Sequence, residues 1–144
     1  MKSSCKLLPN TIVKFHANYL EDDSKPTKKR SHLVIEVDKI KKEALLLKIT
    51  SKWKNYFLQA KLGLVKCLPR PSFLILNRII IFDLSTLKND HRKFRICQIH
   101  QGNCVGKRRF SKIIQKLRKF WQNPLNRDRR KIRLDWSKLK IMEE

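Results

Sequence analysis

The stretch EALLLKITSKWKNYF, residues 43–57, changes from apolar to polar within two residues. Its first eight residues are those of a buried β-strand. Thr50 and Ser51 follow the apolar run, and Lys52, Trp53 and Lys54 then place positive charge on both sides of an aromatic ring. One explanation is a strand that ends in a turn, where hydroxyls are common, with the indole in the core. The alternative is a strand end on a binding surface.

Strand signals dominate the first two thirds of the chain. Residues 10–20 and 31–38 are rich in β-branched and aromatic residues, and a polar segment with a proline between them, residues 21–30, predicts an exposed loop. Residues 68–87 contain two prolines and then a nearly continuous apolar run, which is typical of a strand buried on both faces. These patterns predict a domain made mostly of β-strands.

The last third changes to a helical period. In SKIIQKLRKFW, residues 111–121, apolar side chains recur at the spacing of one helix face. The sequence predicts an amphipathic helix that Ser111 caps and that Asn123-Pro124 ends. We therefore expect a domain over residues 1–122 and a basic C-terminal extension over residues 123–144. The extension is expected to form a strand, a short helix or a segment that orders on a partner.

The charge of the chain narrows the class of partner. The chain has 144 residues, with 35 Lys and Arg against 12 Asp and Glu, and its formal net charge is +23. Such a field attracts polyanions, and nucleic acid is the leading partner because neutralised phosphates release counterions. An anionic membrane surface ranks second, but no apolar stretch is long enough to span a bilayer and no secretory signal is evident. We expect a cytoplasmic protein.

The four cysteines show no disulfide framework, so reduced thiols are expected. His91, Cys97, His100 and Cys104 follow the spacing H-x5-C-x2-H-x3-C, which resembles a zinc knuckle. Structural zinc sites usually have tighter, paired spacings, and the apolar neighbours favour a strand. We therefore expect no metal and no cofactor.

The order of these segments resembles the MazF/PemK family of bacterial toxin endoribonucleases. The resemblance rests on a loop followed by KKRSHLVI, then ALLLKITS, then PSFLILNRIIIFDLSTL, then a terminal amphipathic helix. It covers residues 10–121, and the order and spacing of the signals carry it. The resemblance implies an α+β, mostly β fold: a small, strongly curved barrel of the SH3-like or CcdB-like kind, with the helix packed on it and a basic tail.

The resemblance also implies a function and a partner. Members dimerise and cut single-stranded RNA without a metal, by attack of a 2′-hydroxyl on the neighbouring phosphate, and an antitoxin protein blocks the groove. The family's catalytic arginine and threonine match Arg30 and Thr50. A guanidinium offers a rigid fork of donors to phosphate oxygens, and a hydroxyl at a strand end can donate to another. The expected accessory residues are Ser51, His32 and Arg78, and the expected RNA-binding residues are Lys52, Trp53, Lys54 and Arg70.

The chain departs from the family pattern at three places. Ser31 stands where a proline commonly follows the arginine, Asn10-Thr11 replaces a Gly-Asp, and Ile80 stands where members often carry an arginine. Arg78 lies two residues before Ile80, on the same face of a regular strand, and could replace that arginine. Two non-catalytic alternatives remain: a basic module that binds RNA, DNA or the ribosome on the same kind of barrel, and an interaction protein that docks an acidic partner through residues 107–140.

Overall fold

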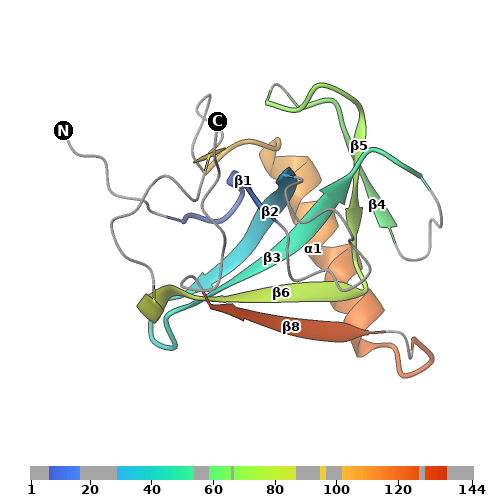
Figure 1. Cartoon of the computed structure of the whole chain (residues 1–144). Coiled ribbons are helices and arrows are strands. Elements are labelled where there is room, and N and C mark those ends of the chain that lie inside the picture. The colour runs from blue at the N-terminus through green and yellow to red at the C-terminus, as the bar shows by residue number, and fades with distance from the viewer. Residues whose placement is uncertain are drawn as a thin grey trace.

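The computed structural model describes residues 7–16, 29–53, 59–65, 67–86, 95–96, 102–126 and 129–135. Within these residues the chain is mostly β, with one α-helix (Figure 1). The elements are β1 (Ile12–His16), β2 (Lys29–Asp38), β3 (Glu43–Thr50), β4 (Gln59–Gly63), β5 (Ser72–Ile75), β6 (Arg78–Asp83), the 3-10 helix η1 (Leu84–Thr86), β7 (Arg95–Ile96), α1 (Lys107–Gln122) and β8 (Arg130–Asp135).

The strands form one curved sheet. Its main path runs β4-β5-β3-β2-β1-β7; off this path, β6 pairs with β3 and β8 pairs with β6. All ladders are antiparallel except that of β6 with β8, which is parallel. The mostly β fold expected from the sequence is confirmed. The closed barrel is not, because among the described strands β4 and β7 end the path and do not pair with each other.

Strand β3 is the centre of the sheet and has the bounds predicted for it, residues 43–50. Along one edge it pairs with β2, and along the other it pairs first with β6 and then with β5. The continuous strand predicted within residues 68–87 is therefore wrong: Leu76 and Asn77 separate β5 from β6. Figure 1 shows the two strands running in different directions on either side of this break. Because of the break, β5 pairs with the last residues of β3 and β6 pairs with its first residues.

The sheet is buried on both faces, and each face has its own core cluster. The helix face includes Leu33, Leu47 and Leu74 and is covered by Ile113, Leu117 and Phe120 of α1. The opposite face is built around Val13, Phe15, Val34, Leu46, Ile80 and Phe82. Alternate residues of β2 and β3 enter the two clusters in turn, as the two-residue period of a strand requires. The same alternation determines which face of the sheet carries each side chain at the ends of β2 and β3.

Helix α1 begins four residues before the start predicted from Ser111. Gly106 occupies the N-cap position, where it has no side chain to cap the helix. Asn123 follows the last helical residue. The predicted stop at Asn123-Pro124 is confirmed. Three of the four added residues, Lys107, Arg108 and Arg109, are basic, and a basic run at a helix N-terminus is unfavourable for the helix dipole. This is why the sequence pattern favoured a later start.

Asn10 fixes the loop before α1 to the start of β1. Its backbone φ is 64°, a left-handed conformation that asparagine tolerates better than most residues. Its side-chain amide donates to the Val105 carbonyl at 2.6 Å, and its side-chain oxygen accepts from the Val105 amide at 2.9 Å. Thr11 Oγ1 accepts from the Gly102 amide at 2.8 Å. The Asn10-Thr11 pair, a departure from the family pattern, thus has a structural role here.

Strand β8 lies in the segment expected to be an extension. It runs parallel to β6, with Ile132 opposite Ile80, and Arg133 donates to the Glu43 carboxylate at 2.6 Å. Part of the segment after residue 122 therefore belongs to the sheet. Among the helices in the described part of the chain, none has the length and apolar composition needed to cross a bilayer.

Candidate nucleic-acid interface

Arg30 and Thr50 lie at the same end of the β2–β3 strand pair. The β2–β3 ladder ends with His32 opposite Lys48; β2 begins three residues before His32, at Lys29, and β3 ends two residues after Lys48, at Thr50. Arg30 and Thr50 are each two residues beyond this last pair, so along their own strands they point to the same face as His32 and Lys48. A guanidinium and a hydroxyl that are 20 positions apart in the chain are thus at one end of the sheet and on one face.

A cross-strand row begins at Thr50 and continues across the next two strands. Thr50 pairs with Phe73 of β5, and Phe73 pairs with Lys61 of β4. We call Arg30, Thr50, Phe73 and Lys61 the rim row. It lies on the face opposite α1, because the neighbours Ile49 and Leu74 point into the helix-side core. The rim row crosses four strands at the end of β3.

The hydroxyl of Thr50 is held in place by the loop that follows it. Thr50 Oγ1 accepts a hydrogen bond from the Lys52 amide at 3.2 Å. A hydroxyl can accept one hydrogen bond and donate another, so this contact leaves its proton for a second acceptor. Arg30 is half-buried and pairs across the β1–β2 ladder with Phe15. Arg30 supplies a cation and Thr50 a hydroxyl donor, and both kinds of group suit a phosphate.

An aromatic pair continues the rim row. The rings of Trp53 and Phe73 are 4.8 Å apart at an angle of 48°. Trp53 is 42% exposed, and Lys61 Nζ lies 5.9 Å from the centre of its ring. An exposed ring beside a cation can stack on an unpaired base while the cation contacts the backbone. The interpretation of Trp53 as a core residue does not fit this exposure.

Arg78 lies on the same face as Arg30. The β3–β6 ladder pairs Leu46 with Ile80, which both belong to the core cluster on the face opposite α1. Arg78 is two residues before Ile80 and points to the same side of a regular strand. Lys48, opposite His32 in the β2–β3 ladder, is a further cation on this face. The sequence-based placement of Arg78 is compatible with this geometry.

His32 does not suit the proton-transfer role considered for it. The ring is completely buried and stacks on Phe15, with 4.2 Å between centroids and 11° between planes. Burial lowers the pKa of His32 to about 3, and the positive charges of Lys48 and Arg30 act in the same direction. A buried imidazole that stays neutral at physiological pH cannot exchange protons with a bound substrate. His32 is therefore a packing residue beneath Arg30 and not an accessory proton-transfer group.

The remaining predicted RNA-binding positions lie around the rim. Ser51 and Lys52 are exposed in the loop after β3. Arg70 is exposed before β5, and its carbonyl accepts from Ser72 Oγ at 2.9 Å. Lys54 lies outside the described residues. Ser51 and Lys52 follow β3 and Arg70 precedes β5, and no contact joins the three side chains in the described part of the chain.

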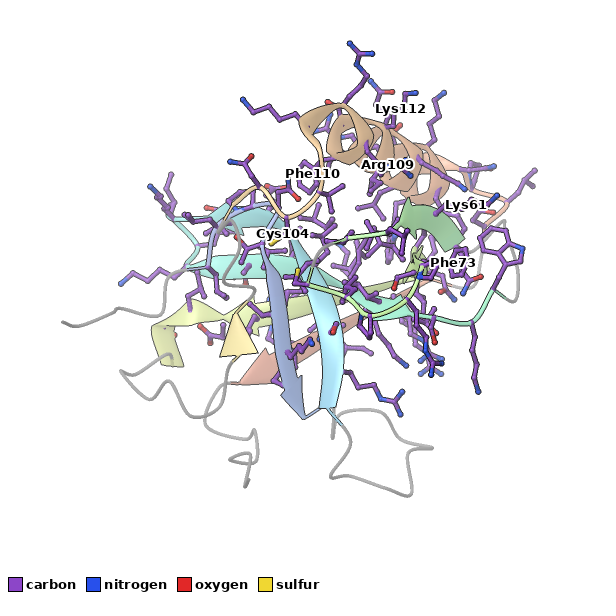
Figure 2. The ribbon with its side chains drawn as sticks, turned by 90° about the horizontal axis from the view of Figure 1, so that it is seen from above. Lys61, Phe73, Cys104, Arg109, Phe110 and Lys112 are labelled. Carbon is purple, nitrogen blue, oxygen red and sulfur yellow. The ribbon has the colours of Figure 1, made fainter. Side chains whose placement is uncertain are left out.

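A second cationic region lies between β4 and α1, and no local sequence pattern predicts it. A groove of about 410 Å³ lies between β4 and α1, with Ala60 and Ile113 in its apolar floor. We call it the basic groove; its positively charged lining is Lys61, Arg108, Arg109, Lys112 and Lys116. Figure 2 labels Arg109 and Lys112 on α1 and Lys61 on the neighbouring strand β4. Because β4 and α1 are more than 40 residues apart, only the fold brings these side chains together.

Lys116 is fixed within the basic groove. Its ammonium group donates to the Gln59 carbonyl at 2.8 Å, and partial burial lowers the pKa of this lysine. Gln59 is itself buried, and its side-chain amide donates to the Lys52 carbonyl at 3.1 Å. These bonds connect the groove wall to the loop that carries Trp53.

The zinc pattern is tested only in part. His91, Cys97 and His100 lie outside the described residues, and within the described ranges no group of three or more metal-binding side chains occurs. Burial raises the pKa of the Cys104 thiol. Cys67 is disulfide-bonded, in contrast to the reduced thiols expected from the sequence.

Comparisons with known proteins identify no relative. No protein-family model, no curated protein and no solved structure matches the chain.

Proposed function

We propose that this protein is a metal-independent endoribonuclease of the toxin–antitoxin type, similar to the MazF/PemK family, that cleaves single-stranded RNA. The observation that supports the proposal is that Arg30 and Thr50 each lie two residues beyond the last β2–β3 pair, at the same end and on the same face of the sheet. In this proposal the curved sheet is a partly open relative of the SH3-like or CcdB-like barrel, and the protein acts as a cytoplasmic homodimer. An antitoxin with an acidic segment would compete with RNA for the rim row.

The rim row supplies charge stabilisation to the reaction. The substrate's 2′-oxygen attacks the adjacent phosphorus, the bond from phosphorus to the 5′-oxygen breaks, and a 2′,3′-cyclic phosphate and a 5′-hydroxyl form. The 2′-hydroxyl loses its proton to solvent, and the leaving 5′-oxygen gains one. Negative charge grows on the non-bridging oxygens, where the guanidinium of Arg30 and the hydroxyl of Thr50 can donate hydrogen bonds. One well-placed donor of this kind is worth about 10²–10³ in rate.

A direct test uses purified protein and single-stranded RNA in EDTA, with mapping of the fragment ends. We expect discrete cuts with cyclic-phosphate ends. We expect Arg30→Ala and Thr50→Val to reduce the rate by about 10²-fold or more, whereas Thr50→Ser, which keeps the hydroxyl, retains most of it. The matched control is Arg118→Ala, which removes one charge from an exposed position of α1.

Two results would contradict the proposal. One is cleavage at the wild-type rate in both Arg30→Ala and Thr50→Val. The other is salt-sensitive RNA binding by the wild type with no cut at any site. The second result would favour a non-catalytic RNA-binding module, an alternative supported by α1, whose sixteen residues include seven basic side chains and no acidic one.

A further inference from the structure

The basic groove has the features of an anion site. Its walls carry cations from two separate elements, Lys61 from β4 and Arg108, Arg109, Lys112 and Lys116 from α1. The lining includes no acidic residue. Its volume, about 410 Å³, lies within the range of small-ligand sites. The groove is thus large enough for part of a nucleotide chain and has the charge to hold it.

The start of α1 is built in a way that disfavours the isolated helix. Its first turn contains no acidic residue, and Gly106 at the N-cap makes no side-chain hydrogen bond. Lys107, Arg108 and Arg109 place three positive charges at the positive end of the helix dipole. A bound polyanion would relieve this repulsion, because it brings negative charge to the same end of the helix.

Arg109 is positioned across the groove by a close approach to β4. A Cβ atom at Gly63 would lie only 3.3 Å from Nη1 of Arg109, and Gly63 has a backbone φ of 76°. The guanidinium therefore lies over the end of the strand, where a larger residue would disturb it. This contact brings a cation of α1 to the edge strand of the sheet.

Lys61 joins the basic groove to the rim row. It pairs with Phe73, its ammonium lies 5.9 Å from the Trp53 ring centre, and it also lines the groove. Lys61 on the edge strand β4 thus belongs to both regions, and RNA bound at Thr50, Phe73 and Trp53 would meet its next cation beside the groove. The aromatic rings and the cations alternate in the way expected of a single-strand path.

We propose that the basic groove binds the sugar–phosphate backbone of the RNA segment that flanks the cleavage site on one side. The inference rests on the proposed function and adds the path of the substrate to it. The cations of α1 contact phosphates without reading bases, so the groove contributes affinity and not sequence preference. An acidic protein segment is the competing occupant. The exposed ring of Trp53, 5.9 Å from Lys61 of the groove lining, favours RNA, because an unpaired base can stack on it.

The test measures how RNA length affects binding. We would use an oligonucleotide around a mapped cut site, with a 2′-deoxy residue at the scissile position to prevent cleavage. Extending it by three nucleotides at one end should tighten binding to the wild-type protein by about tenfold, and extending it at the other end should not. In Arg109→Ala/Lys112→Ala the gain should disappear, and the log–log salt slope should fall by about 0.7 for each lost contact. Arg118→Ala/Lys119→Ala removes the same charge from α1 outside the groove lining and is the control.

The outcomes separate this inference from the proposed function. If the wild type cuts RNA and both double variants lose affinity equally, the charge of α1 acts non-specifically and the inference is wrong. The inference is also wrong if polyglutamate binds in the groove and does not compete with RNA. The groove would then be a site for an acidic protein segment. A length gain at one end that only the groove variant loses supports it. If the wild type neither cuts nor binds RNA, the proposed function itself fails. Circular dichroism of both double variants checks that α1 is intact.

Discussion

The rim row and the basic groove are both positively charged, but they are built differently. In the rim row, Arg30 and Thr50 are strand residues at one end of the β2–β3 pair and adjoin a closely packed core in which His32 and Phe15 are fully buried. In the groove, the cations are exposed side chains of one helix against one edge strand. Fixed donors suit a reacting phosphate, and adaptable cations suit a backbone of variable sequence. The comparison separates residues that should change the rate from residues that should change affinity.

The largest expected effect comes from Arg30→Lys. This substitution keeps the charge but loses the planar fork of donors, so the single-turnover cleavage rate should fall by about 10²–10³, or about 2.7–4 kcal/mol. The salt slope of RNA binding should not change. Lys112→Ala in the groove should do the reverse, with weaker binding and a nearly unchanged rate at saturating RNA. Equal effects of the two variants on the rate would erase the distinction between the regions.

His32 should make the packing under the rim row sensitive to acid. Its folded-state pKa is about 3, against 6.5 for the ordinary group, so between these values the unfolded chain binds a proton that the folded chain excludes. Stability therefore falls as the pH drops below about 6.5, by about 2 kcal/mol at pH 5. Urea unfolding from pH 7.5 to pH 5 should show this loss, and His32→Asn should lose about 2 kcal/mol less over the same interval. An identical pH slope in the variant would argue against the buried neutral ring.

Trp53 lies between the two regions and should affect affinity. Removal of its ring in Trp53→Ala takes away one stacking surface while Phe73 remains, so single-stranded RNA should bind about tenfold more weakly, near the lower end of the 1–3 kcal/mol expected per base. Trp53→Phe should recover much of the loss. Fluorescence anisotropy with a labelled oligonucleotide measures both. A Trp53→Ala protein that binds like the wild type would place the RNA elsewhere.

Gly106→Asp should act with opposite sign on stability and on binding. Nothing lies within 4 Å of a Cβ atom placed at Gly106, and the position is the uncapped N-cap of α1. The aspartate should stabilise the protein by about 1 kcal/mol through the cap and the dipole, and should weaken RNA binding because it adds negative charge beside the basic groove. Gly106→Asn caps the helix without charge and should stabilise without the binding loss. Thermal unfolding and anisotropy give the two signs.

The part of the fold that the sequence predicts is the part with local periodicity. The bounds of β3 and the end of α1 follow from patterns of adjacent residues. The break at Leu76-Asn77 was missed because both flanking segments are apolar, and what divides them is the change of partner along β3. The start of α1 was missed because its first turn contradicts the usual charge preference of a helix.

The candidate site divides in the same way. The resemblance indicates Arg30 and Thr50, and the structure places both at the same end of the β2–β3 pair. His32 was overvalued because an ordinary histidine pKa was assumed, and only the packing around Phe15 shows that the ring is buried. The basic groove could not be anticipated, since its two walls come from β4 and α1 and no local pattern relates them.

The Asn10 clamp has a consequence for the order of folding. Its hydrogen bonds to Val105 join positions 95 residues apart, and they hold the approach to α1 against the first strand. Contacts of such separation form late, after the nearer ladders have reduced the entropy of closing so large a loop. Helix α1 can form early, but the basic groove is complete only after the helix has packed on the sheet, when the two ends of the domain have met. Nascent chains on the ribosome would therefore lack this groove until nearly all of the domain had emerged.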